Sequence, residues 1–161
     1  MLSSVALAIY ALALVAAGLS DLVRYEIPNS LCLALVAGFA LFAVSLPLAI
    51  VAWHVAAGMA VLAATALCFA FRIFGGGDAK LLAATALWVG WQNLASFILV
   101  TAVAGGILGL FLLALRRFAP APSAERWYGR LLARDEGVPY GIAIAFSGLV
   151  LLPRLSPALL Q

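Results

Sequence analysis

Residues 81–115 read LLAATALWVGWQNLASFILVTAVAGGILGLFLLAL, a run of 35 residues without a charged side chain. One helix that crosses a bilayer needs about 20 apolar residues. The run is therefore long enough for two such helices, and Gly90-Trp91-Gln92-Asn93 marks a break between them in residues typical of a short turn. This stretch predicts a membrane protein of the all-α class.

Three further charge-free runs, 1–20, 27–71 and 137–153, continue the pattern, and Pro47 divides the second of them into two helices. The chain has 161 residues, of which 67% are hydrophobic and 9% charged, and a mean hydropathy of +1.21. Soluble domains carry far more charge. We expect residues 1–161 to form one polytopic bundle of six transmembrane helices, near 3–21, 29–46, 50–71, 79–91, 94–115 and 138–154.

The first twenty residues lack the basic segment of a signal peptide and exceed the usual length of its apolar region. We therefore expect a retained helix there. Cys32 and Cys68 fall inside expected helices without CxxC spacing, so neither a disulfide framework nor a zinc site is expected. No metal and no cofactor are predicted.

The basic residues give the orientation. Positive charge gathers in the cytoplasmic segments of a membrane protein. If the N-terminus lies on the periplasmic side, Arg154 is the one basic residue that falls on that side. The cytoplasmic residues are Arg24, Arg72, Lys80, Arg116, Arg117, Arg126, Arg130 and Arg134. Both termini then lie on the periplasmic side, while Asp21 and Asp78 lie at one depth near the cytoplasmic face. The net charge of +3 is thus an orientation signal, and no nucleic-acid partner is expected.

Asp21 and Asp78 stand at the edges of long apolar runs. An ionisable residue at membrane depth is costly and indicates a functional site. When two carboxyl groups share one site, ionising both is unfavourable because the two negative charges repel each other. One ionised and one protonated carboxyl group suit acid–base chemistry on a water molecule and a carbonyl. Because such a pair titrates as a unit, the sequence assigns neither role to one residue.

The first motif around this pair is the segment from Asp21 to Asn29. Arg24, Pro28 and Asn29 would fix this loop so that the carboxylate of Asp21 stays aimed inward. The same residues also fit an ordinary interfacial loop, with Pro28 at the start of the next helix.

The second motif is Gly75-Gly76-Gly77-Asp78-Ala79-Lys80. Its glycines allow a second backbone to approach and leave N–H groups free for a carbonyl oxygen. Lys80 would favour the ionised carboxylate from a distance or contact substrate. A glycine turn with Asp78 as the helix N-cap fits these residues as well.

The third motif is Pro139-Tyr140-Gly141, at the start of the last long helix. Pro139 and Gly141 would let this helix approach the two carboxylates closely, and Tyr140 would separate them from lipid or water. An ordinary helix start with Pro in its first turn is the alternative.

Together the three motifs resemble the type IV prepilin leader peptidases, an aspartic protease family with a GxGD signature. They are most similar to the short CpaA/TadV-like form that serves Flp/Tad-type pili. The resemblance implies that Asp21 and Asp78 are the catalytic pair of an endopeptidase in a bacterial inner membrane, acting near its cytoplasmic face on a prepilin or pseudopilin precursor. Longer relatives carry a four-cysteine zinc region and also N-methylate the product, and this chain has only two cysteines. Methyltransferase activity is therefore not implied.

Other classes of membrane protein place acids in a helical bundle. A proton-coupled transporter would show internal repeats or broken helices near the midplane, and no repeat is evident here. A non-enzymatic membrane component of a secretion system is a further alternative. Presenilin-type GxGD proteases carry more helices and a PAL motif, where this chain has Pro139-Tyr140-Gly141. No particular precursor and no oligomeric state follow from the sequence.

The long loop over residues 116–137 carries Arg126, Arg130 and Arg134 at intervals of four residues. This spacing predicts an interfacial helix on anionic lipid headgroups. At the opposite face, Trp53, Trp88 and Trp91 are expected in an aromatic belt. His54 is expected there too, as a structural or interfacial residue.

Overall fold

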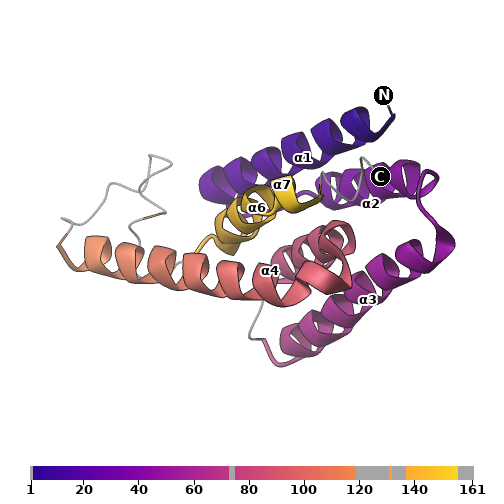
Figure 1. Ribbon diagram of the computed structural model, residues 1–161. Helices are drawn as coiled ribbons and strands as arrows, with labels where there is room; N and C mark the ends of the chain where they lie inside the picture. Colours follow the sequence, from indigo (N-terminus) through magenta and orange to yellow (C-terminus); the bar gives the residue numbers. More distant parts are fainter. Residues whose placement is uncertain (1, 73–74, 119–130, 132–136, 156–161) are drawn as a thin grey trace.

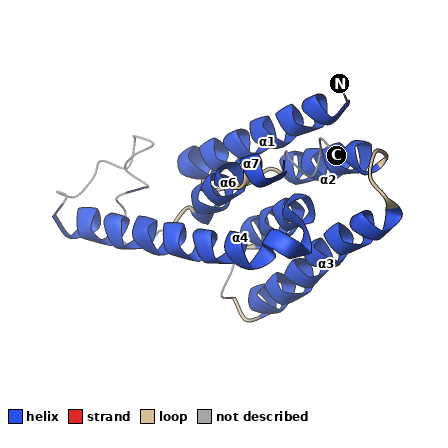
Figure 2. Cartoon of the chain, viewed as in Figure 1, coloured by secondary structure: helices blue, strands red, loops and turns tan. Residues whose placement is uncertain are grey.

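The computed structural model describes residues 2–72, 75–118, 131 and 137–155, and all regular structure in these residues is helical (Figure 2). This confirms the all-α prediction. In chain order the helices are α1 (Leu2–Arg24), α2 (Asn29–Ala43), α3 (Leu48–Ala70), α4 (Gly76–Phe118), α6 (Tyr140–Val150) and α7 (Leu152–Leu155).

Three of these helices, α1, α3 and α4, are long and apolar enough to cross a membrane. Helices α2 and α6 are also apolar, but they have 15 and 11 residues. Helix α4 has 43 residues, which at 1.5 Å per residue is about 65 Å and roughly twice the hydrocarbon thickness of a bilayer. The count of six spans stays a prediction, because three of the six apolar segments are shorter than a full crossing: α2, α6 and the part of α4 before Gly90.

Helix α4 is broken at Gly90, where the backbone has φ 72° and ψ 171°. The expected turn over Gly90-Trp91-Gln92-Asn93 is therefore confined to one residue, and the helix resumes at Trp91. We call residues 76–89 the first arm and residues 91–118 the second arm. A Cβ at position 90 would lie 2.8 Å from Cε1 of His54, and the backbone there is left-handed. Glycine satisfies both constraints.

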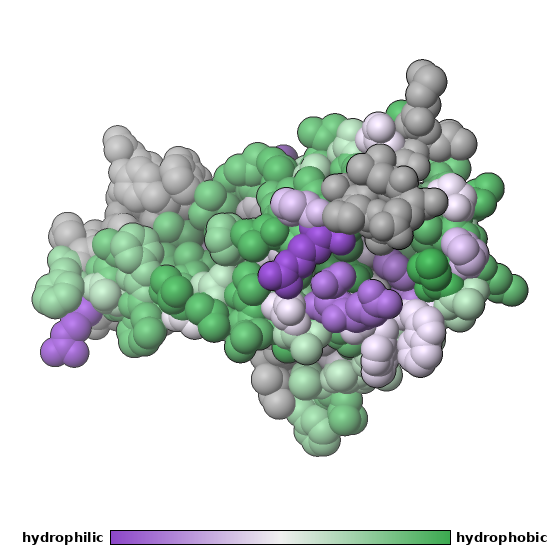
Figure 3. Space-filling model, in the orientation of Figure 1, coloured by the Kyte–Doolittle hydropathy of each residue, from purple (hydrophilic) through white to green (hydrophobic). Residues whose placement is uncertain are grey.

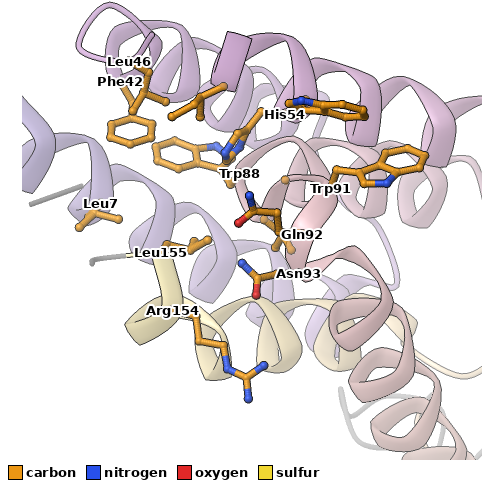
Figure 4. Close-up of a pocket in the computed structure, with 14 residues that line it drawn as sticks. Leu7, Phe42, Leu46, His54, Trp88, Trp91, Gln92, Asn93, Arg154 and Leu155 are labelled. Carbon is orange, nitrogen blue, oxygen red and sulfur yellow. The ribbon is translucent and has the colours of Figure 1, made fainter. Parts of the chain in front are cut away.

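His54 has a structural role at this break. Its Nδ1 lies 2.9 Å from the carbonyl oxygen of Leu87, at the end of the first arm. Because a carbonyl only accepts, Nδ1 carries the proton. His54 lines a small cavity of about 120 Å³. The amides of Gln92 and Asn93 point toward the same space (Figure 4).

Trp88 forms the centre of the core and not part of an outer belt, so the prediction for this residue is wrong. It is 2% exposed, its Nε1 donates to the carbonyl of Leu35 at 2.8 Å, and its ring lies 4.9 Å from that of Tyr10. Trp53 and Trp91 are exposed, as an interfacial position requires, and their rings lie 6.1 Å apart. A sequence that is apolar on every helix face does not distinguish these environments.

The helices are arranged around the first arm of α4. Helix α4 packs against α2, α3 and α6, while α1 packs against α2 and α6. Helices α2 and α3 are joined by the short turn at residues 44–47 and diverge from it (Figure 1). Hydrophobic residues cover most of the visible surface, including the second arm of α4 (Figure 3). Such a surface fits contact with lipid.

The predicted interfacial helix, with Arg126, Arg130 and Arg134, lies outside the described residues. Arg116, at the end of α4, donates to the carbonyl of Leu131 at 3.0 Å and to the carbonyl of Gly137 at 2.9 Å. These bonds connect Leu131 and Gly137 to the end of α4.

We expect Gly90→Ala to destabilise the protein by about 1–3 kcal/mol, because the new Cβ meets the His54 ring in a strained backbone. Gly106→Ala is the matched control, since a Cβ there meets nothing within 4 Å. Thermal unfolding in detergent, followed by circular dichroism, measures both. Equal unfolding midpoints for the two variants would contradict the account of the break.

Candidate functional site

Asp21 lies in the last turn of α1, which continues to Arg24 and not only to residue 21 as expected. Its side chain is 5% exposed. The helix ends because Tyr25 adopts a positive φ of 56°, and the Tyr25 N–H donates to the carbonyl of Asp21 at 2.9 Å. The chain turns at this residue, so the loop that follows folds back beside the carboxylate.

The carboxylate of Asp21 accepts a hydrogen bond from the backbone N–H of Gly141 at 2.6 Å. Gly141 is in the first turn of α6. The N-cap residue of this helix is Pro139, which makes no side-chain capping hydrogen bond. The first N–H groups of a helix need acceptors, and negative charge is favourable beside them. Asp21 therefore caps α6 from a different helix, and the α6 terminus in turn stabilises the buried carboxylate.

Asp78 lies in the first turn of α4. The preceding glycines bring the backbone close to its carboxyl group: a Cβ at Gly75 would lie 2.9 Å from Asp78 Oδ2. Asp78 and Asp21 line the same cavity, of about 500 Å³, and are near enough to interact electrostatically. The structure thus brings together the two carboxylates that the sequence paired.

The cavity is built from the end of α1, the loop before α2 and the start of α4. Its predicted members are Asp21, Arg24, Pro28, Asn29, Gly75, Gly76, Gly77 and Asp78. The lining also includes Ser20, Tyr25, Glu26 and Ile27, which are not among the site residues predicted from the sequence. Ser20 fixes the loop by donating to the carbonyl of Glu26 at 2.8 Å.

Ile27 connects the three motifs. A Cβ at Gly77 would lie 3.2 Å from Ile27 Cβ, and a Cβ at Gly141 would lie 3.0 Å from Ile27 Cδ1. Both glycines therefore leave room for this side chain. The available signal was an apolar residue in a polar loop, directly before Pro28. The sequence does not indicate that Ile27 packs against Gly77 and Gly141, because these glycines lie in segments that are distant along the chain.

Four predicted site residues stand outside the cavity lining, and one of them, Gly141, contacts Asp21 as described above. Lys80 Nζ donates to Asn29 Oδ1 at 3.0 Å, so it contacts the cavity through Asn29. Pro139 is buried and precedes α6. The Tyr140 ring packs over Gly105, where a Cβ would overlap it. The ring thus lies against the second arm of α4, and the expected role of Tyr140 in separating the carboxylates from lipid or water stays a prediction.

In the described part of the chain, no group of three or more His, Cys, Asp or Glu side chains is placed to hold a metal ion. Cys32 is buried in α2 and Cys68 is half-buried in α3, and both are free thiols. The cavity lining includes the carboxylates of Asp21, Glu26 and Asp78. Carboxyl groups of this kind suit proton transfer.

The fold and the cavity define a class: a helical protein with membrane-spanning segments and a pair of carboxylates in one cavity. A model of the type IV leader peptidase family matches residues 8–110 of the chain. That segment includes both Asp21 and Asp78. The chain belongs to the type IV leader peptidase family.

Several relatives are named prepilin leader peptidase/N-methyltransferase. The protein from Aeromonas salmonicida (strain A449) is 30% identical over 152 residues, which is 86% of this chain and 45% of the relative. The protein from Burkholderia pseudomallei is 36% identical over 74 residues, 46% of this chain and 19% of the relative. The chain thus spans less than half the length of these relatives. No solved structure matches.

We expect Asp21→Ala to cost about 1–2 kcal/mol more stability than Asp21→Asn. Alanine leaves the buried Gly141 N–H without its acceptor, whereas the amide oxygen of asparagine keeps one. Unfolding midpoints of both variants in the same detergent measure this difference. Equal midpoints would show that the hydrogen bond contributes nothing to the fold.

Proposed function

We propose that this chain is a membrane-embedded aspartic endopeptidase that removes the cytoplasmic leader peptide of a prepilin or pseudopilin precursor of the Flp/Tad type. The observation that supports it is the convergence of Asp21 and Asp78, from two separate helices, on one cavity. Membership of the leader peptidase family supports the substrate class.

The proposed mechanism uses the two carboxyl groups in different protonation states. One ionised carboxylate takes a proton from a water molecule, whose oxygen attacks the scissile carbonyl carbon. The second carboxyl group, protonated, donates a hydrogen bond to the carbonyl oxygen. The C–N bond then breaks as the amine leaving group receives a proton. Water is the only co-reactant that this hydrolysis needs.

The geometry supports a division of these roles. The Gly141 N–H donates to Asp21 and favours its ionised form. We therefore assign the base to Asp21 and the shared proton to Asp78. The cavity of about 500 Å³ that residues 75–77 line together with Asp78 offers space for an extended peptide.

The proposed location is a bacterial inner membrane, with Asp21 and Asp78 near the cytoplasmic face and both described chain ends toward the periplasm. The distribution of basic residues supports this orientation. We propose peptidase activity without methyl transfer, on the basis of the resemblance to the short form of the family given in the sequence analysis and of the two cysteines in this chain.

Replacing either Asp21 or Asp78 by asparagine should abolish leader removal, because each role requires a carboxyl group. Glu26→Gln is the control, since Glu26 is an exposed carboxylate at the same cavity. The measurement is the conversion of precursor to product in membranes that hold equal amounts of each variant. Full cleavage by Asp21→Asn or Asp78→Asn would refute the proposed mechanism.

Gly141→Ala should lower cleavage by about tenfold or more, since small displacements of a catalytic group are costly. The added Cβ would lie 2.8 Å from Asp21 Oδ2 and 3.0 Å from Ile27 Cδ1, so both side chains must move. Gly106→Ala, a helical glycine with open space around it, should cleave normally. Initial rates on one precursor compare them, and equal rates would contradict the close approach of α6.

A further inference from the structure

An apolar groove of about 570 Å³ lies beside the carboxylate cavity. Its floor is the first arm of α4, where small residues such as Ala83 and Ala84 leave it hollow. Its rims are α2 and α3, which contribute exposed apolar side chains. The rim residues are Leu33, Val36, Val55, Met59 and Leu62.

The arrangement of the helices explains the groove. Helices α2 and α3 diverge from the turn at residues 44–47, and the first arm of α4 packs against both of them (Figure 1). The space between the rims therefore widens away from that turn. It widens toward Asn29, the first residue of α2.

The groove is continuous with the carboxylate cavity. Asn29 lines both, and Lys80 lines the groove while donating to Asn29 Oδ1 at 3.0 Å. The polar groups of the groove gather at this junction, with Ser30 beside them. The remaining length is apolar. A ligand in the groove thus meets lipid-like surroundings along most of its length and hydrogen-bonding groups at the entrance to the cavity.

We propose that this groove receives the apolar membrane helix of the substrate, and that the adjoining peptide crosses the Asn29–Lys80 junction in extended form to reach Asp21 and Asp78. This inference rests on the proposed function. Membrane helices associate by close packing on small residues, which the floor supplies. A peptide that leaves its helix needs new partners for its backbone, and Asn29 and Lys80 supply them where the groove ends.

The test compares two substrates: the full precursor, and a short peptide that spans the cleaved bond but lacks the membrane helix. Leu33→Trp and Met59→Trp fill the groove from exposed positions, 68% and 59% exposed. Leu41→Trp and Leu67→Trp are matched controls on the same helices, 56% and 61% exposed and outside the groove.

Each groove variant should raise KM for the full precursor by about tenfold and leave the short peptide unchanged, because the lost interaction is one of substrate binding. The controls should change neither. Unchanged KM for the full precursor, or an equal loss with both substrates, would overturn the groove assignment. If the unmodified chain cuts neither substrate, the proposed function fails and this inference fails with it.

A second measurement separates a protein helix from lipid as the occupant. A photoactivatable side chain at Leu33 or Met59, in the Asp78→Asn background, should cross-link to the precursor, and the same group at Leu41 should not. Cross-linking to lipid alone at all three positions would contradict the proposal.

Discussion

The hydrogen bond from the Gly141 N–H to the Asp21 carboxylate is the interaction on which the site depends. It joins the first helix of the chain to α6, across 120 residues of sequence. A buried carboxylate is costly without a donor, and the first turn of α6 lacks a local side-chain cap. Each group satisfies the other. The resulting contact fixes the depth and direction of Asp21.

The same contact explains why the surrounding residues are small or apolar. Gly141 must lack a side chain to approach Asp21, and Gly77 must lack one to make room for Ile27. Ile27 then fills the space between the starts of α4 and α6, beside the cavity that holds Asp78. The three motifs are thus parts of one packing arrangement, in which a side chain at Gly75, Gly77 or Gly141 would displace a carboxylate or Ile27.

The sequence predicted the helical class and the pairing of Asp21 with Asp78, because charge is rare in this chain and its few positions are informative. It did not predict the contacts that Ile27, Trp88 and Tyr140 make. In helices that are apolar on every face, hydrophobic periodicity does not say which face is buried. The break at Gly90 was visible as turn residues, but its confinement to one position depends on the contact with His54, which is distant in sequence.

The two ends of the bundle differ in how firmly they are packed, and this difference has a functional consequence. At one end Trp88 stacks on Phe42 at 5.7 Å and packs against Tyr10, whose hydroxyl donates to the carbonyl of Gly148 at 3.1 Å. At the other end glycines, a loop and a cavity surround the carboxylates. Because the aromatic cluster joins α1, α2, α4 and α6, the packing at that end does not depend on contact between α2 and α3 beside the site. The groove between these two helices ends at Asn29 and Lys80, beside the cavity that holds Asp78; under the proposed function, this is the side from which a substrate peptide reaches the carboxylates.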